Sequence, residues 1–95
     1  MNTTVKPNKA GAIDMKKIIR FTATWCQPCK AMAMILNNVD SPYPIEVVDI
    51  DDRSDVAIEF GIRSVPTLVM IEDGTVLKKM IGVKSEELVK EWING

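Results

Sequence analysis

Short runs of hydrophobic and β-branched residues recur along the 95-residue chain between polar, turn-forming stretches. Four of these runs are too short for helices and are rich in Val, Ile and aromatic residues, which is typical of strands. They predict strands at residues 18–23, 45–50, 67–71 and 76–81. Asp73-Gly74 lies between the last two runs, and this dipeptide favours a tight antiparallel hairpin.

The remaining hydrophobic residues repeat with helical spacing. One helix is expected to follow Pro28, which a first helical turn tolerates, and to end near Asn37 or Asn38. A second is expected to begin with Ser54 as its N-cap and to end before Gly61. A third starts near Ser85. The predicted buried face of the first helix consists of Met32, Ile35, Leu36 and Val39. That of the third helix consists of Leu88, Val89, Trp92 and Ile93.

This order of elements predicts an α/β fold. The first two strands are joined through a helix, so they are expected to be parallel with a right-handed crossover, whereas the last two form an antiparallel hairpin. One mixed sheet of about four strands with helices on both faces is the economical packing. We therefore expect residues 1–95 to form a single domain, in which residues 1–16 are a shortened or partly irregular N-terminal segment.

Composition narrows the function classes. The hydrophobic fraction is 46 % and the net charge is −1, with acidic and basic residues well mixed, so neither nucleic acid nor an anionic membrane is an expected partner. The chain has no histidine, which excludes His-based acid–base catalysis. No apolar signal segment or transmembrane-length run is visible. We expect a cytoplasmic protein in a reducing compartment, where two cysteines indicate a reversible pair more than a permanent crosslink.

The only two cysteines, Cys26 and Cys29, stand between a predicted strand and a predicted helix. Residues at i and i+3 of a helix lie on one face about 5 Å apart, a separation that a disulfide tolerates. The free N–H groups and the dipole at a helix N-terminus favour a thiolate. This placement is typical of a redox motif. Cys26 is then the expected nucleophile and Cys29 the resolving thiol.

Two other interpretations of the pair stay open at this point. The cysteines could form half of a zinc site that a second chain completes, because a structural zinc ion needs four ligands. They could also be inert, small apolar residues at the start of a helix.

The segment "TWCQPCK" (24–30) resembles the active-site segment of thioredoxins, whose usual form is W-C-G-P-C-K. Two further segments are similar to thioredoxin motifs in the same order: "FGIRSVPT" (60–67), and "IEDGTVLKKMIG" (71–82), a hairpin that leads to a glycine. The resemblance extends from about Lys17 to Gly95. It implies a thioredoxin-like fold and a dithiol–disulfide oxidoreductase.

The resemblance also implies roles for individual residues. Trp25 forms a wall of the substrate site, and Pro66 is a cis-proline facing the cysteines. The backbone of Val65 hydrogen-bonds an extended substrate segment, and Gly82 allows that segment a close approach. Pro28 follows the thioredoxin pattern. Gln27 replaces the usual glycine in the dipeptide that tunes reduction potential, which spans roughly −270 to −120 mV across the superfamily.

Arg20 is the largest departure from the thioredoxin pattern. Relatives usually keep a buried Asp here, beneath the resolving cysteine, and their partner lysine aligns with Val47. A cation at this position lowers a nearby thiol pKa, whereas a carboxylate raises it. Because a buried Arg needs a partner, we expect Arg20 either to pair with Asp49 or to extend its head group to solvent. The alternative is that Arg20 points away from the thiols and has no part in their chemistry.

The sequence and the resemblance together imply a monomeric enzyme that reduces protein disulfides and needs no metal or organic cofactor. By analogy with the thioredoxin family, its own disulfide is reduced by a thioredoxin-reductase-type flavoprotein or another dithiol. Two alternatives remain. The first is a glutaredoxin-like, glutathione-dependent oxidoreductase. The second is a binding module with the thioredoxin fold and no turnover.

Overall fold

The structure, a computed structural model, describes residues 15–95. In this part of the chain, strands and helices follow the predicted order. Their bounds are β1 Lys16–Thr22, α1 Gln27–Asn37, β2 Ile45–Asp49, α2 Ser54–Glu59, β3 Thr67–Glu72, β4 Thr75–Ile81 and α3 Glu86–Asn94. The prediction for residues 1–14 lies outside the described residues.

The strands form one four-stranded sheet in the order β2-β1-β3-β4. β1 and β2 are parallel, and β1–β3 and β3–β4 are antiparallel. Both the parallel crossover and the hairpin were predicted, and both are confirmed. Asp73 and Gly74 have positive φ values of 53° and 83°, the conformation for which a two-residue hairpin selects Asp-Gly.

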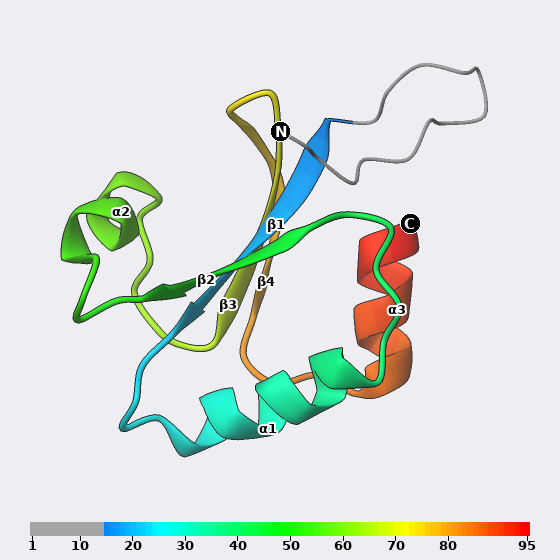
Figure 1. Cartoon of the computed structure of the whole chain (residues 1–95), viewed down its shortest axis with the longest axis horizontal. Coiled ribbons are helices and arrows are strands. Elements are labelled where there is room, and N and C mark those ends of the chain that lie inside the picture. Colours follow the sequence, from blue (N-terminus) through cyan, green and yellow to red (C-terminus); the bar gives the residue numbers. More distant parts are fainter. Residues whose placement is uncertain (1–14) are drawn as a thin grey trace.

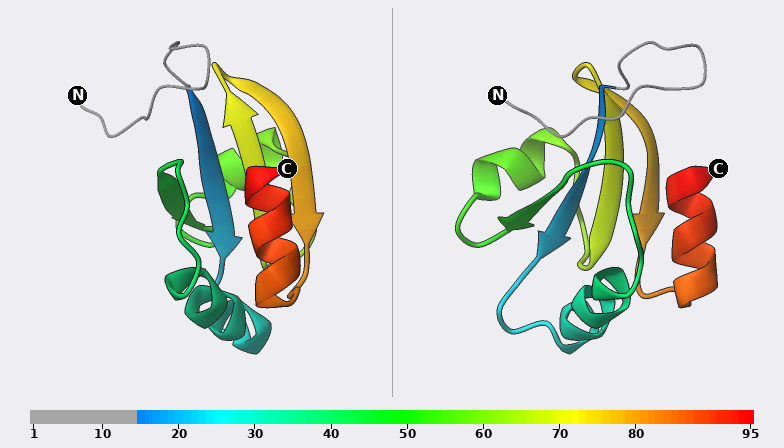
Figure 2. Two further views of the ribbon diagram at one scale, coloured as in Figure 1. Left: turned by 90° about the vertical axis from the view of Figure 1, so that its right-hand side faces the viewer. Right: turned by 45° about the vertical axis from the view of Figure 1, so that its right-hand side comes forward.

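Helices cover both faces of the sheet, as predicted (Figures 1 and 2). On one face, Met32 of α1 and Val89 of α3 pack against Ile18 and Leu68. On the other face, Ala57 of α2 joins the cluster around Phe21. Successive strand residues point to opposite faces, so β1 contributes to both cores. Figure 1 shows the loop after β1 and the start of α1 at one end of the sheet, and the site is built at this end.

Two local predictions need correction. The N-cap of α2 is Arg53, and Ser54 is the first helical residue; no side chain caps the helix. Leu88 was assigned to the buried face of α3, but it is 50 % exposed, while Val89 and Ile93 are buried. The helix lies along one edge of the face that it covers, so only a narrow stripe of its residues contacts the sheet. No helix within residues 15–95 is long and apolar enough to cross a membrane.

Candidate active site

The two cysteines meet at the start of α1. Cys26 is the N-cap of the helix, and its Sγ accepts a hydrogen bond from the backbone N–H of Cys29 at 3.1 Å. The two residues form a disulfide with a Cα–Cα separation of 5.2 Å. Pro28 lies in the first turn, where its missing N–H would have no helical partner in any case. The N-terminus of the helix therefore brings the two sulfurs together.

Both cysteines are shielded from solvent, but unequally. Cys26 is 4 % exposed and Cys29 is 1 % exposed. They form a small cluster with Ala23, against which Ile50 and Val65 pack. Cys26 lies at the N-cap of α1 and Cys29 lies within its first turn, so Cys26 is the nearer of the two to the exposed loop before the helix.

The segment before β3 faces the cysteines. The Val65–Pro66 peptide bond is cis, as the resemblance implied. The Sγ of Cys26 lies 3.7 Å from the carbonyl oxygen of Val65. The Gly82 N–H donates to the Pro66 carbonyl at 2.9 Å, which joins the end of β4 to this segment. Gly82 has a φ of +85°, and a Cβ built there would have no atom within 4 Å, so the space beside it is open.

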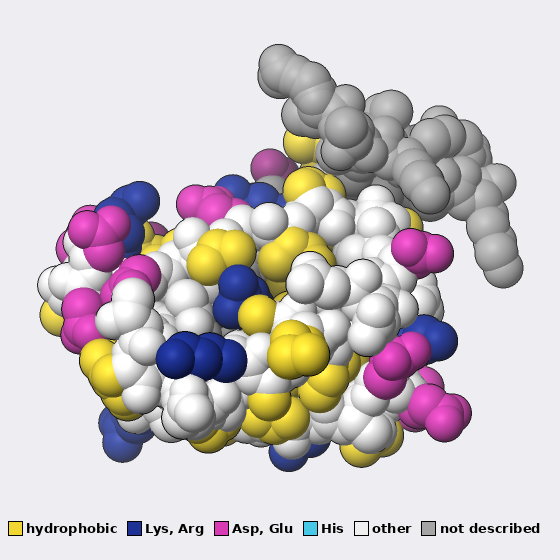
Figure 3. All heavy atoms as spheres, turned by 60° about the horizontal axis from the view of Figure 1, so that its bottom comes forward, with side chains coloured by type: hydrophobic (Ala, Val, Ile, Leu, Met, Phe, Trp, Pro, Cys, Tyr) yellow, Lys and Arg dark blue, Asp and Glu magenta, His cyan; other side chains and the backbone are white. Residues whose placement is uncertain are grey.

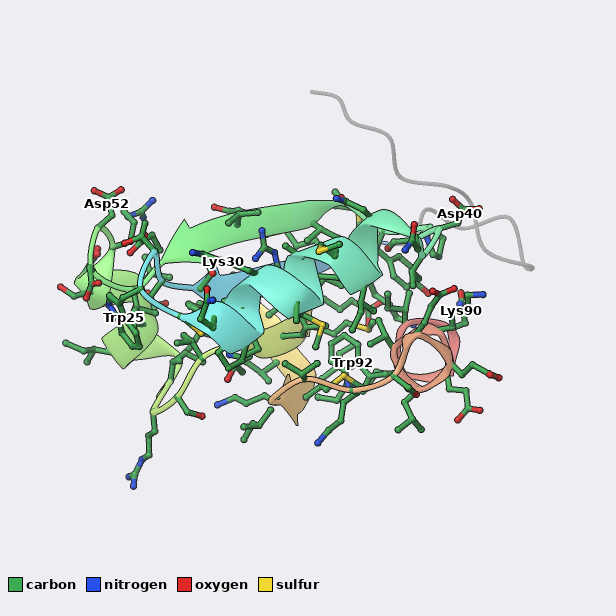
Figure 4. The ribbon with its side chains drawn as sticks, turned by 90° about the horizontal axis from the view of Figure 1, so that it is seen from below. Trp25, Lys30, Asp40, Asp52, Lys90 and Trp92 are labelled. Atoms are coloured by element: carbon green, nitrogen blue, oxygen red, sulfur yellow. A yellow bond between two sulfur atoms is a disulfide. The ribbon has the colours of Figure 1, made fainter. Side chains whose placement is uncertain are left out.

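Exposed side chains surround the buried sulfurs. Trp25 is 66 % exposed, and its Nε1–H donates to Oδ2 of Asp51 at 2.8 Å. Gln27 and Pro28 are exposed at the start of the helix. Figure 4 shows Trp25 at the N-terminal end of α1, at the same end of the molecule as Asp52 and at the opposite end from Lys90. The site is therefore a buried disulfide with exposed residues around it, at the start of α1.

Arg20 lies on the sheet beneath α1. It pairs in register with Val47 and Leu68, and Leu68 belongs to the core under α1. Facing residues of paired strands share one face of the sheet, so Arg20 points to the α1 side. It is partly buried, and this burial lowers the pKa of Arg20 from its usual value.

The structure does not bring Arg20 and Asp49 together as an ion pair within the described residues. Asp49 instead turns to its own loop, where its Oδ1 accepts the backbone N–H groups of Asp51 at 2.8 Å and Asp52 at 3.3 Å. An Asp that follows a strand often bonds the backbone two residues on, and this local turn is easier to form than a cross-strand ion pair. Arg20 is left without a protein partner among residues 15–95.

Two residues of the site were missed from the sequence, Ile50 and Asp51. Both follow β2, and Trp25 follows the parallel strand β1. The carboxyl ends of neighbouring parallel strands lie at one edge of a sheet, so the loop after each strand was a usable signal. The sequence analysis placed Ile50 in the strand 45–50 and assigned no role to Asp51.

The arrangement suits thiol–disulfide exchange. Reduction of the disulfide would leave Cys26 as a thiol at a helix N-terminus, where a backbone N–H and the helix dipole stabilise a thiolate. Within residues 15–95, no group of three or more Cys, Asp or Glu side chains is placed to hold a metal ion.

Comparison with known proteins gives one consistent result. The thioredoxin family model matches residues 8–95. Thioredoxin H4 of Arabidopsis thaliana is 37 % identical over 89 residues, covering 90 % of this chain and 75 % of its own. The thioredoxin of Bacillus subtilis is 35 % identical over 78 residues, covering 78 % of this chain and 75 % of its own.

Solved structures agree with these relatives. The oxidised mitochondrial thioredoxin 3 of Saccharomyces cerevisiae superposes with a TM-score of 0.76 at 32 % identity, covering 85 % of this chain and 78 % of that one. A thioredoxin mutant of Halobacterium salinarum gives a TM-score of 0.78 at 26 % identity, covering 85 % and 74 %. Together with the Cys26–Cys29 pair, these matches show that the chain belongs to the thioredoxin family of dithiol–disulfide oxidoreductases.

Proposed function

We propose that this protein reduces protein disulfides, with Cys26 as the attacking thiol and Cys29 as the resolving thiol. The Cys26 thiolate attacks one sulfur of the substrate disulfide, and the other substrate sulfur leaves as a thiolate and takes up a proton. Cys29 then attacks the Cys26 sulfur of the mixed disulfide. The second substrate thiol leaves, the Cys26–Cys29 disulfide forms, and two electrons have passed to the substrate.

One observation carries the assignment of roles. Cys26 is the N-cap of α1 and its sulfur already accepts the Cys29 N–H, so a negative charge on this sulfur is stabilised before any substrate arrives. Cys29 lies one turn further in and is almost fully buried. A buried thiol can reach only its neighbour, which suits resolution of the mixed disulfide.

The substrate segment is proposed to lie in extended form beside Val65 and Pro66, against the open space at Gly82. Three observations support this position: the Cys26 sulfur is close to the Val65 carbonyl, a Cβ at Gly82 would meet no atom, and Trp25 is largely exposed beside the pair. An added strand would gain backbone hydrogen bonds from Val65, independent of substrate sequence. Trp25, Gln27 and Pro28 would contact its side chains.

Turnover requires a reductant for the Cys26–Cys29 disulfide. Thioredoxins work with a partner reductase, and we propose a thioredoxin-reductase-type flavoprotein or another dithiol for this chain. The reaction needs no metal or organic cofactor, because the two sulfurs carry the electrons. A monomer in a reducing compartment fits this role, since only there is the dithiol form regenerated.

A Cys29→Ser variant tests the mechanism directly. Without a resolving thiol, the mixed disulfide on Cys26 should accumulate when the reduced variant meets an oxidised protein such as insulin. Mass spectrometry of non-reduced samples should place the bond on Cys26. A Cys26→Ser variant serves as the matched control and should trap nothing, because Cys29 lacks the N-cap position and the backbone N–H that favour a thiolate on Cys26.

Three outcomes would contradict the proposal. Equal trapping through Cys29 in the Cys26→Ser variant would reverse the roles. Reduction of insulin by the intact protein with glutathione as sole reductant, but not with a thioredoxin reductase, would favour a glutaredoxin-like enzyme. A double Cys26→Ser, Cys29→Ser variant that kept full biological activity would show a binding module in place of an enzyme.

A further inference from the structure

A small pocket adjoins the proposed substrate position. It has a volume of about 100 Å³ and lies between the segment before β3 and the end of β4. Its lining residues are Gly61, Ile62, Arg63, Ser64, Thr67, Lys79 and Ile81. Ser64 directly precedes Val65, and Ile81 directly precedes Gly82. The pocket lining therefore includes the chain neighbours of both residues that the proposed substrate segment contacts.

Strand register places one cation of the pocket on the α2 side of the sheet. Lys79 faces Val69, and Val69 belongs to the core under α2. Paired residues share one face, so Lys79 points toward α2, and its Nζ donates to the Phe60 carbonyl at 2.7 Å. Lys78, one residue earlier, points to the other face and contacts Trp92. The hydrogen bond to Phe60 holds the Lys79 ammonium beside the segment that begins at Gly61.

The second cation comes from that segment. Arg63 is exposed and has no ion pair or side-chain hydrogen bond within residues 15–95. The Lys79 ammonium has three protons and gives one to Phe60, so donors remain on both side chains. None of the residues that line the pocket in this part of the chain is acidic. The pocket thus carries two positive charges and unused hydrogen-bond donors next to the redox pair.

We propose that Arg63 and Lys79 form an anion-accepting subsite that selects protein disulfides with an acidic side chain near the attacked cysteine. The proposal rests on the substrate position given above. An Asp or Glu of the substrate would enter the pocket and accept hydrogen bonds from the guanidinium and the ammonium. The carboxylate and not the backbone then supplies the sequence preference, because the backbone contacts at Val65 are the same for every substrate.

Paired peptides test the subsite. Each peptide has an intramolecular disulfide, and it carries either Glu or Gln at one position within three residues of a cysteine, on either side. The reduced protein should reduce the best Glu peptide about three- to tenfold faster than its Gln partner at low salt, as two partly exposed ion pairs allow. The ratio should fall toward one in 0.5 M salt, since salt screens exposed charges.

Variants of Arg63 and Lys79 test whether these two side chains cause the preference for the Glu peptide. Arg63→Gln and Lys79→Gln should each lower the Glu-to-Gln ratio, and the double variant should abolish it. Because the result is a ratio of two peptides on one protein, a general change in activity or stability cancels. Lys90→Glu is the charge control: Lys90 lies on α3, far from Trp25 in Figure 4, and this variant should keep the preference.

The outcomes separate this inference from the proposed function. If neither peptide of a pair is reduced, or reduction does not need Cys26, the proposed function fails. If both peptides are reduced equally at every position, the function holds and the subsite is overturned. A Glu preference that survives in the Arg63→Gln, Lys79→Gln double variant overturns it as well.

Discussion

The two faces of β1 carry adjacent residues with opposite characters. Phe21 points toward α2, is 0 % exposed, and packs with Ile19 and Val48 in an apolar cluster. Its ring lies 5.8 Å from that of Phe60. Arg20 points toward α1 and is only partly buried, with no protein partner among the described residues. At this point of β1 the α2 side is a closed face, and the α1 side, where Ile18 is also buried, is a charged face at Arg20.

The edge position of β2 explains how the charged face is tolerated. β2 is the outer strand of the described sheet next to β1, and Val47, which faces Arg20 in register, is 54 % exposed. The long Arg20 side chain can thus bury its methylene groups under α1 and keep its guanidinium near solvent. Figure 3, turned to bring this lower part of the molecule forward, shows Lys and Arg between hydrophobic patches in the middle and acidic side chains at the two ends. We therefore predict that a change at Phe21 alters stability more than the thiols, and that a change at Arg20 alters the thiols more than stability.

The largest expected effect is a loss of stability when the buried ring of Phe21 is removed from the closed face of β1. Phe21→Ala removes a fully buried ring and leaves a cavity, which should lower the free energy of unfolding by about 3–5 kcal/mol. Urea unfolding of the reduced protein, followed by Trp fluorescence, measures this loss. Phe21→Leu should cost less because it retains most of the apolar volume.

The same pair of variants checks the division between the faces. Alkylation of Cys26 as a function of pH reports its thiol pKa, and in the folded Phe21→Leu variant this pKa should stay unchanged. A shift as large as that caused by a change at Arg20 would show that the two faces are not independent.

The sequence predicted the strands and helices more closely than it predicted the contacts between distant segments. The hydrophobic pattern, together with turn and capping residues, located every described strand and each predicted helix end to within two residues, because each element buries one face against the sheet. The pairing of Arg20 with Asp49 could not be judged in this way. It depends on whether Asp49 bonds its own loop or a neighbouring strand, and both choices are compatible with the same alternation. The pocket of Arg63 and Lys79 depends on two segments that meet only in the folded chain.

A smaller effect, on the KM for substrate, is expected from Asp51, which lies among the exposed residues around the disulfide. Asp51→Ala removes the acceptor of the Trp25 Nε1–H, and the exposed indole should then sample more orientations. This exposed hydrogen bond contributes a net free energy of roughly 1 kcal/mol. We therefore expect KM for a protein disulfide to rise about two- to fivefold, with kcat nearly unchanged.

Asp52→Ala is the matched control for that experiment. Asp52 has the same charge and is also exposed, but it does not hold Trp25. Steady-state reduction of insulin should therefore give the same KM as the intact protein. An equal rise in both variants would show that the loop acts through its net charge and not through Trp25.

The smallest and most specific effect is expected on the charged face. Burial lowers the pKa of Arg20, but a guanidinium stays protonated throughout the range in which thiols titrate, so it acts there as a fixed positive charge. A fixed cation beneath α1 favours thiolates. Arg20→Met should therefore raise the thiol pKa of Cys26, and Arg20→Asp should raise it further, by a few tenths of a unit to about one unit. A higher pKa leaves less thiolate at neutral pH, so alkylation at pH 7 should slow in the same order.

The free energy of unfolding of the Arg20 variants distinguishes an electrostatic role of Arg20 from a packing role. Arg20→Met keeps the length of the side chain and removes a partly buried, unpaired charge, so the free energy of unfolding should be unchanged or higher. Lys17→Met, which removes an exposed cation of the same strand that pairs with Glu46, controls for net charge and should leave the thiol pKa where it was. If Arg20→Met and Arg20→Asp give the same pKa as the intact protein, the guanidinium is not coupled to the cysteines, and Arg20 serves only as a partly exposed polar residue beside the edge strand β2.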